Sequence, residues 1–270
     1  MTGAPSKDPR PSLNFCDLPP WVIASRAYND NPQPLRIQGT RPTHHRLFAR
    51  LDGLPTWEER AQAFQDYMDV AFHLHQWRGE SHPTGQLSLK NSYLRFLRGW
   101  LFDANSMEGA VLKGWVESRI GISPTYHRGP IPNIHSEHYM GYLADRMNGS
   151  ARTHAILSQL DLLYEFVQYE LQRRHPDTSH LTLYRGVYDF SEHTVLENLG
   201  ENRAVVRLNN LNSFTREFER AWEFGTRVLE VRVPATKVFF DGSLIHSGIL
   251  RGEEEVLVLG GEFELKVRVY

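Results

Sequence analysis

The chain has 270 residues, of which 40% are hydrophobic and 23% are charged, and its formal net charge at pH 7 is −2. A chain of this length can bury a sizeable core, and its near-neutral charge excludes a general electrostatic attraction to nucleic acid or to an anionic membrane. With a single cysteine, Cys16, it forms no intramolecular disulfide, and no apolar run of about 18 residues predicts a transmembrane helix. We expect a cytoplasmic protein, without membrane insertion, that recognises a protein or a small molecule.

The first fifty residues carry few signals of regular structure. Residues 1–12 are polar and rich in proline, which predicts a disordered leading segment. From residue 13 to residue 50, proline and asparagine are frequent, as in Pro19-Pro20 and Asn31-Pro32. We expect these residues to wrap the rest of the protein as an irregular segment with aromatic anchors, rather than as helices or strands.

Helical periodicity dominates from residue 56 to residue 175. Thr56 and Glu59 have the spacing of a capping box, and the apolar residues behind them predict a helix from residue 57 to about residue 77. Further helices are predicted over residues 88–102, after a cap at Ser106, over residues 136–147 and over residues 156–175. The last of these has the clearest amphipathic stripe.

The pattern changes to short apolar and alternating runs after Pro176. Strands are predicted over residues 181–187, 204–208, 227–233, 238–240, 256–259 and 263–269, with one short helix over residues 216–224. We therefore predict an α+β fold. A mostly helical N-terminal lobe of residues 13–175 precedes a mainly antiparallel β lobe of residues 176–270, and the two lobes pack as one unit.

In the stretch from residue 252 to residue 261, charged residues stand directly before residues expected in the core. Three glutamates run directly into the apolar residues 256–259, which predict a strand buried on both faces, and Gly260-Gly261 predicts a hairpin turn. Residues two apart in an extended segment share a face, so Glu253 and Glu255 point the same way. Such a pair suits stabilising a cation or accepting a proton, although an acidic run before a strand is by itself more often a solvated loop.

Two other strand ends carry polar residues. Arg185 ends one strand and is followed by Gly186, where a ligand such as a pyrophosphate could approach the backbone closely. Ser213 and Thr215 end another strand on either side of Phe214. Alone, the first pattern is typical of a surface turn and the second of a helix N-cap.

Together, Arg185, Ser213 and Glu255, which are 28 and 42 residues apart, resemble the Arg-Ser-Glu signature of the mono-ADP-ribosyltransferases. The resemblance implies that NAD is the co-substrate and that no metal is required. It implies that Arg185 holds the NAD phosphates and that Ser213 supports the catalytic carboxylate and the nicotinamide ribose. Glu255 would bind the ribose 2′-hydroxyl and stabilise the oxocarbenium-like transition state. Glu253 would orient an arginine acceptor and help to deprotonate it.

The surrounding residues complete the expected site. The residues expected to bind NAD are Arg185, Gly186, Ser213, Phe214, Thr215 and Phe224. In the superfamily this segment is Ser-Thr-Ser. This chain departs from that pattern, with Phe214 in the middle position and Thr215 in the last. The loop over residues 241–252 is the candidate for acceptor recognition, through Ser243, His246 and Arg251.

A narrower resemblance extends over essentially the whole chain. The segments "LPPWVIASRAYNDNPQPLRI" and "HSEHYMGYLADRMNGSARTHAIL" are similar to those of the dinitrogenase reductase ADP-ribosyltransferase family of nitrogen-fixing bacteria. This resemblance implies that the acceptor is an arginine of the nitrogenase iron protein and that its modification switches nitrogen fixation off. It also implies regulation by a PII-type signalling protein and reversal by a separate glycohydrolase.

Two other functions stay open at this point. An NAD glycohydrolase would use water in place of the acceptor, and the presence of Glu253 argues against it. A non-catalytic regulatory module would use the cleft only to bind a partner, and such a module has no need of Glu255. The histidines near residues 44, 73 and 127–138 are interpreted as structural or surface residues, because nothing in their spacing brings metal ligands together.

Overall fold

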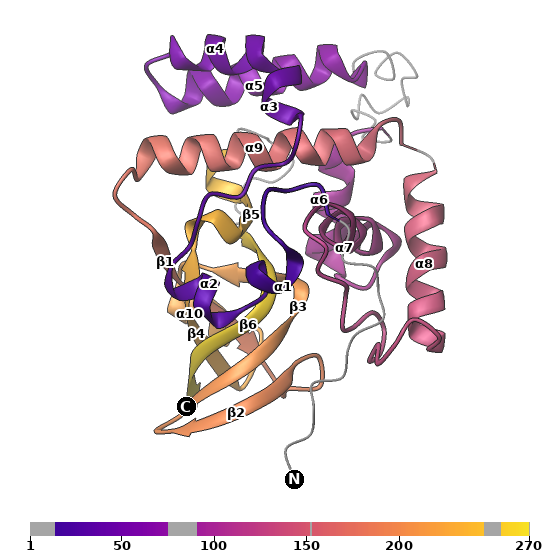
Figure 1. Cartoon of the computed structure of the whole chain (residues 1–270), viewed down its shortest axis with the longest axis vertical. Helices are drawn as coiled ribbons and strands as arrows, with labels where there is room; N and C mark the ends of the chain where they lie inside the picture. Colours follow the sequence, from indigo (N-terminus) through magenta and orange to yellow (C-terminus); the bar gives the residue numbers. More distant parts are fainter. Residues whose placement is uncertain (1–13, 75–90, 152, 246–254, 270) are drawn as a thin grey trace.

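The helices of the chain come first and its sheet follows, as predicted (Figure 1). The computed structural model describes residues 14–74, 91–151, 153–245 and 255–269, so the predicted disordered lead lies outside the described residues. Its α-helices are α1 (Pro20–Ile23), α2 (Arg26–Asp30), α3 (Thr40–Thr43), α4 (His45–Asp52), α5 (Trp57–Ala71), α6 (Tyr93–Phe102), α7 (Met107–Arg119), α8 (Glu137–Ser150), α9 (Ile156–Arg174) and α10 (Phe218–Trp222). Its strands are β1 (His180–Val187), β2 (Thr194–Gly200), β3 (Arg203–Thr215), β4 (Arg227–Pro234), β5 (Val238–Asp241) and β6 (Glu255–Val269). The predicted α+β class is confirmed.

The segment from residue 14 to residue 52 is more regular than its composition indicates, and the prediction of an irregular segment is wrong there. Pro20 begins α1, where its missing N–H loses no helical hydrogen bond. The Ser25 side chain caps α2 by accepting from the backbone N–H of Tyr28. Asn29 then donates to the backbone oxygen of Glu262, which fixes α2 against β6. Helices α1 to α4 have only four to eight residues each, too few for a periodic apolar pattern to reveal them.

Helices α5 and α7 begin at the predicted caps, and α8 begins next to the predicted start at residue 136. Thr56 and Glu59 form both bonds of the capping box at the start of α5. Ser106 caps α7 and Ser136 caps α8, each by accepting a backbone N–H three residues further on. Helix α5 ends at Ala71, earlier than the predicted end near residue 77, and residues 75–90 lie outside the described part of the chain.

Helix α9 forms the layer between the outer helices and the sheet. In Figure 1 it runs across the molecule, with α4 and α5 on one side and the sheet on the other. Phe166 of α9 stacks on Phe64 of α5, with the ring centroids 4.0 Å apart. Towards the sheet, the Gln168 amide donates to the backbone oxygen of Val238 at 2.7 Å. One hydrophobic cluster contains residues of both halves of the chain, so the two halves share a core.

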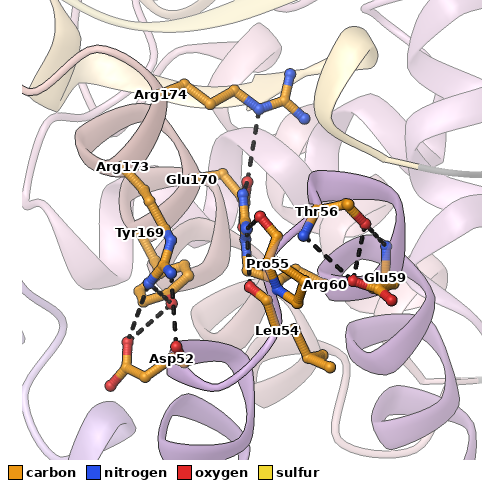
Figure 2. Close-up of polar contacts among 10 residues, drawn as sticks. All are labelled: Asp52, Leu54, Pro55, Thr56, Glu59, Arg60, Tyr169, Glu170, Arg173 and Arg174. Carbon is orange, nitrogen blue, oxygen red and sulfur yellow. Dashed lines mark hydrogen bonds and ion pairs between the residues drawn. The ribbon is translucent and has the colours of Figure 1, made fainter.

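A buried ion pair fixes α5 to α9 (Figure 2). The Arg60 guanidinium donates to both oxygens of Glu170, from Nε at 2.5 Å and from Nη2 at 3.0 Å. Its Nη1 donates to the backbone oxygens of Leu54 and Pro55 at 3.1 Å each. The two residues are 4% and 1% exposed, so the bidentate geometry and the carbonyl partners offset the desolvation of both charges.

The sheet is antiparallel in all its described pairings and curves round on itself. The strand order is β2-β3-β1-β4-β6-β5, and β3 also pairs with β6. The pairings of β1 with β4, β4 with β6, β6 with β3 and β3 with β1 therefore form a ring. Strand β2, which the sequence analysis did not predict, is exposed along nearly its whole length and lacks an alternating apolar pattern.

The hairpin turn predicted at Gly260-Gly261 is wrong, because β6 runs through both glycines as one strand. On β3, Asn209 and Asn210 together stand opposite Gly260, which makes a β-bulge. A Cβ atom on Gly260 would lie 1.7 Å from the backbone oxygen of Asn209. Gly261 has a φ of +116°, a conformation that favours glycine. Both glycines accommodate the bulge rather than a turn, and the strand predicted over residues 256–259 is buried on both faces.

Candidate active site

A pocket of about 340 Å³ brings most of the predicted site residues together. It lies where the C-terminal end of α6 meets β1, β3, α10 and the start of β6, and residues 100–104 form one of its walls. The predicted residues that line it are Arg185, Gly186, Ser213, Phe214, Thr215, Phe224 and Glu255. Strand ends that are far apart in the sequence therefore converge on one cavity.

Arg185 is held by contacts on both sides of its guanidinium. Its Nη1 donates to the backbone oxygen of Ser213 at 3.0 Å, and its Nη2 donates to Glu192 at 3.2 Å. Its Nε is buried without a hydrogen-bond partner. Burial lowers the pKa of the guanidinium, whereas the carboxylates of Glu192 and Glu255 raise it. Glu192, which the sequence analysis missed, lies between β1 and β2 in a stretch that carries no recognisable pattern.

Glu255 begins β6 and faces the end of β3. It stands directly across from Thr215, and Ser213 stands across from Leu257. Residues two apart on a strand share a face, so Ser213 and Glu255 are diagonal neighbours on the face of the sheet that lines the pocket. The half-buried Glu255 carboxylate is also close enough to act on the Arg185 charge. The pocket therefore combines a guanidinium, a hydroxyl and a carboxylate.

Trp100 of α6, in the helical half of the chain, contacts Ser213. Its indole Nε1 donates to Ser213 Oγ at 2.8 Å, and the residue is only 3% exposed. This contact was not predicted from the sequence. No local signal identifies it, since the two residues are 113 positions apart.

Gly186 lines the pocket and also has a packing role that the sequence did not suggest. A Cβ atom at this position would lie 2.0 Å from the backbone oxygen of Ala221. The close approach is thus made by α10 of the same chain, and the glycine lets this helix pack against β1. Phe224, just after α10, lines the pocket with a side chain that is 60% exposed, whereas Phe214 is buried.

The remaining predicted residues lie elsewhere or outside the described residues. Ser243 belongs to a short 3-10 helix over residues 242–244, and its Oγ donates to Asp241 at 2.7 Å. It is not among the described residues that line the pocket. Glu253, His246 and Arg251 lie outside the described part of the chain.

Two more titratable groups are buried close enough to Arg185 for its charge to act on them. Lys113 donates to Asn105 Oδ1 at 3.1 Å and to the backbone oxygen of Tyr126 at 3.0 Å, and burial lowers its pKa to about 7. Both ring nitrogens of His193 are buried without a partner. Burial, and then the charge of Arg185, lower the pKa of His193 to about 3, so this imidazole is neutral.

Neither a cluster of metal ligands nor a membrane-spanning helix occurs among the described residues. In this part of the chain, no group of three or more His, Cys, Asp and Glu residues is placed to hold a metal ion. None of the helices described is both long enough and apolar enough to cross a membrane.

Comparison with known proteins identifies close relatives. The family model described as dinitrogenase reductase ADP-ribosyltransferase (DRAT) matches residues 13–267. The "NAD(+)--dinitrogen-reductase ADP-D-ribosyltransferase" of Rhodospirillum rubrum is 41% identical over 259 residues, which cover 94% of each chain. No solved structure matches significantly. The similarity therefore extends over both halves of the chain and includes the pocket.

Proposed function

The chain belongs to the dinitrogenase reductase ADP-ribosyltransferase family, and we propose that it transfers ADP-ribose from NAD to dinitrogenase reductase, the iron protein of nitrogenase. The name of the Rhodospirillum rubrum relative states this donor and this acceptor. Within the molecule, the observation that carries the proposal is the convergence of Arg185, Ser213 and Glu255 on one pocket. Modification of the iron protein would inactivate it and switch nitrogen fixation off. Transfer is favoured over the glycohydrolase and over the non-catalytic module, because the relative is a transferase.

The pocket residues suit the chemistry of this transfer. Arg185 is suited to the NAD pyrophosphate, since a guanidinium forms charge-assisted bonds to phosphate oxygens. In the reaction, the bond between C1′ of the ribose and the nicotinamide nitrogen breaks, and the nitrogen keeps the electron pair. The positive charge that develops on the ribose is stabilised by the Glu255 carboxylate. A nitrogen of the acceptor then bonds to C1′ and loses a proton.

We assign an arginine as the acceptor and Glu253 as the group that assists its deprotonation. A guanidinium has a pKa above 12 and is a poor nucleophile until a carboxylate helps to remove a proton. The resemblance to arginine-specific enzymes supports this role for Glu253, as it supports acceptor recognition by Ser243, His246 and Arg251. Replacing residues 243–250 by another loop is expected to reduce labelling of the iron protein while NAD hydrolysis continues. Equal loss of both activities would contradict this assignment.

Replacing Glu255 by glutamine tests the proposed function. Because glutamine keeps the size of the side chain but not its charge, we expect the transfer rate to fall roughly 10²-fold or more while NAD binding stays near normal. The measurement is incubation with labelled NAD and the iron protein, with the modified peptide located by mass spectrometry. One ADP-ribose on one arginine is expected with the unaltered chain.

Glu264→Gln provides the matched control on the same strand. Glu264 is an exposed residue of β6 that pairs with Arg26 and Arg203, away from the pocket. We expect this variant to retain full activity. Normal turnover in Glu255→Gln would refute the catalytic assignment. Release of nicotinamide without protein labelling would favour the glycohydrolase, and an absence of NAD consumption would favour the binding module.

We also propose that a PII-type signalling protein regulates the chain, that the reaction takes place in the cytoplasm, and that the two lobes work as one unit. The family resemblance supports the regulator, and the shared hydrophobic cluster supports the single unit. Mixing the chain with the nucleotide-bound regulator and measuring a change in transfer rate would test the first of these. No change in rate at any nucleotide state would contradict it.

A further inference from the structure

The C-terminal end of α6 is a wall of the pocket as well as part of the helical half. Trp100 donates to Ser213 Oγ at 2.8 Å, and the next four residues along the chain also line the pocket. Phe102 among them is 80% exposed. The buried Trp100 ring lies with the Lys113 ammonium 5.9 Å from its centre and helps to line a small second cavity with Arg185 and Glu192. The residue is therefore surrounded by the groups that form the site.

The hydrogen bond from Trp100 determines where Ser213 can donate. An indole N–H is a donor only, whereas a hydroxyl has one hydrogen and two lone pairs. When Trp100 occupies a lone pair of Ser213 Oγ, the single hydroxyl hydrogen has to go to a different acceptor. Arg185, which contacts the backbone oxygen of Ser213, cannot accept it. The strand register places the carboxylate of Glu255 diagonally across from Ser213 on the pocket face, where it can serve as this acceptor.

We propose that Trp100 is a positioning residue of the transfer reaction, whose indole N–H orients the Ser213 hydroxyl so that its hydrogen points to the reacting carboxylate of Glu255. This inference rests on the proposed function and adds a role for the helical half of the chain in it. Trp100 acts through Ser213, because its indole N–H is bonded to the Ser213 hydroxyl. A hydroxyl that donates to Glu255 holds the carboxylate in one orientation, in which it can stabilise a developing positive charge.

The chain offers a matched control for this contact. Trp115 is also fully buried, and its indole N–H also donates to a side chain at 2.8 Å, in this case Asp161. Asp161 keeps two further bonds from Arg119 when that donor is removed. Trp115 is not among the described residues that line the pocket. Trp115→Phe therefore removes an indole N–H and a similar side-chain volume from the core, but it breaks no contact with Ser213.

The experiment compares Trp100→Phe, Trp115→Phe, Ser213→Ala and the double variant Trp100→Phe with Ser213→Ala, using the full chain, NAD and the iron protein. We expect Trp100→Phe to lower kcat about tenfold, the effect of one lost hydrogen bond, with the KM for NAD within about twofold of normal. Trp115→Phe should leave both constants unchanged. The double variant should be no slower than Ser213→Ala, because Trp100 acts through the hydroxyl that is already missing.

Three outcomes would overturn the inference. They are a normal kcat in Trp100→Phe, an equal loss in Trp115→Phe, and independent multiplication of the two losses in the double variant. If Trp100→Phe does not fold, replacing Trp100 by its benzothiophene analogue keeps the ring volume and removes only the N–H, and the same expectations apply. Assaying Glu255→Gln in parallel distinguishes failure of the proposed function from failure of the role proposed for Trp100. Full activity in that variant refutes the proposed function, whereas its inactivity beside a fully active Trp100→Phe refutes only the role of Trp100.

Discussion

The Arg185 guanidinium already has a negatively charged partner before any ligand binds. Glu192 accepts from Nη2, and the backbone oxygen of Ser213 accepts from Nη1. A pyrophosphate that binds at this arginine competes with the Glu192 carboxylate for the same donors and the same charge. If Arg185 holds the NAD phosphates, as proposed, Glu192 is placed to tune the affinity for NAD.

Glu192→Gln is expected to strengthen NAD binding. The variant loses the competing charge, and its amide oxygen can still accept from Arg185. The Glu192 side chain is 39% exposed, so solvent screens the pair and the gain in affinity should be only about two- to fivefold. Titration calorimetry with NAD at low and high salt measures this gain, which should shrink as salt rises. Glu197→Gln is the control, because Glu197 is an exposed residue of β2 that pairs with Arg26. Weaker binding in Glu192→Gln would mean that its charge is needed to hold Arg185 in place.

The residues of the site differ in how far the sequence could reveal them. Arg185, Ser213 and Glu255 each end or begin a strand, and their order along the chain is recognisable without a structure. Trp100 and Glu192 could not be predicted, because their roles depend on how α6 and the segment before β2 pack against distant strands. Trp100 in particular resembles any other apolar residue on the buried face of a helix.

Among the elements, β6 connects Glu255, the proposed catalytic carboxylate, to the rest of the fold. It begins at Glu255, continues as a buried strand and reaches the bulge at Gly260. The bulge turns two asparagines of β3 towards the helical half. Asn209 donates to the backbone oxygen of Tyr126 at 2.9 Å, and Asn210 donates to that of Lys113 at 2.8 Å. A pair of glycines is typical of a turn as well as of a bulge, and only the contacts of the opposite strand distinguish the two.

Gly260→Ala is expected to destabilise the protein by about 3 kcal/mol or more, because the new Cβ would overlap the backbone oxygen of Asn209 and force the strands apart. Urea denaturation followed by circular dichroism measures the free energy of unfolding. Gly141→Ala is the matched control, since Gly141 lies in α8 and a Cβ there meets no atom within 4 Å. It should raise the stability by about 0.5–1 kcal/mol through helix propensity. An unchanged unfolding midpoint in Gly260→Ala would contradict the bulge.

At the scale of the whole molecule, two buried lysines lie where the helical half meets the sheet. Lys113 of α7 lines the small cavity that Trp100 and Arg185 also line. Lys237, just before β5, donates to the backbone oxygen of Gly260 at 3.1 Å, with its ammonium 4.6 Å from the centre of the Phe263 ring. Burial lowers the pKa of each lysine to about 7. For Lys237, the charge of Glu262 opposes that shift.

These lysines make the stability of the fold depend on pH. Between pH 7 and pH 9, a lysine in the unfolded chain keeps its proton. In the folded chain, Lys113 and Lys237 release theirs, because their pKa is lowered. The unfolded chain then binds more protons, so the free energy of unfolding rises with pH, on the order of 1 kcal/mol per pH unit for each lysine. Above about pH 10 the sign reverses, because the unfolded lysines then lose their protons as well, while burial raises the pKa of Cys16 and Tyr28 so that the unfolded chain releases those protons first.

Lys237→Met separates the contribution of one lysine to this dependence. We expect urea denaturation at pH 7, 8 and 9 to show a rising free energy of unfolding in the unaltered chain and about half that slope in the variant. Lys266→Met, at an exposed position of β6, should keep the full slope. The aromatic rings of Tyr28 and Phe263 oppose the expected effect, because their faces stabilise an ammonium. A flat stability between pH 7 and pH 9 would show that these rings keep Lys237 protonated in the folded protein and would contradict the prediction.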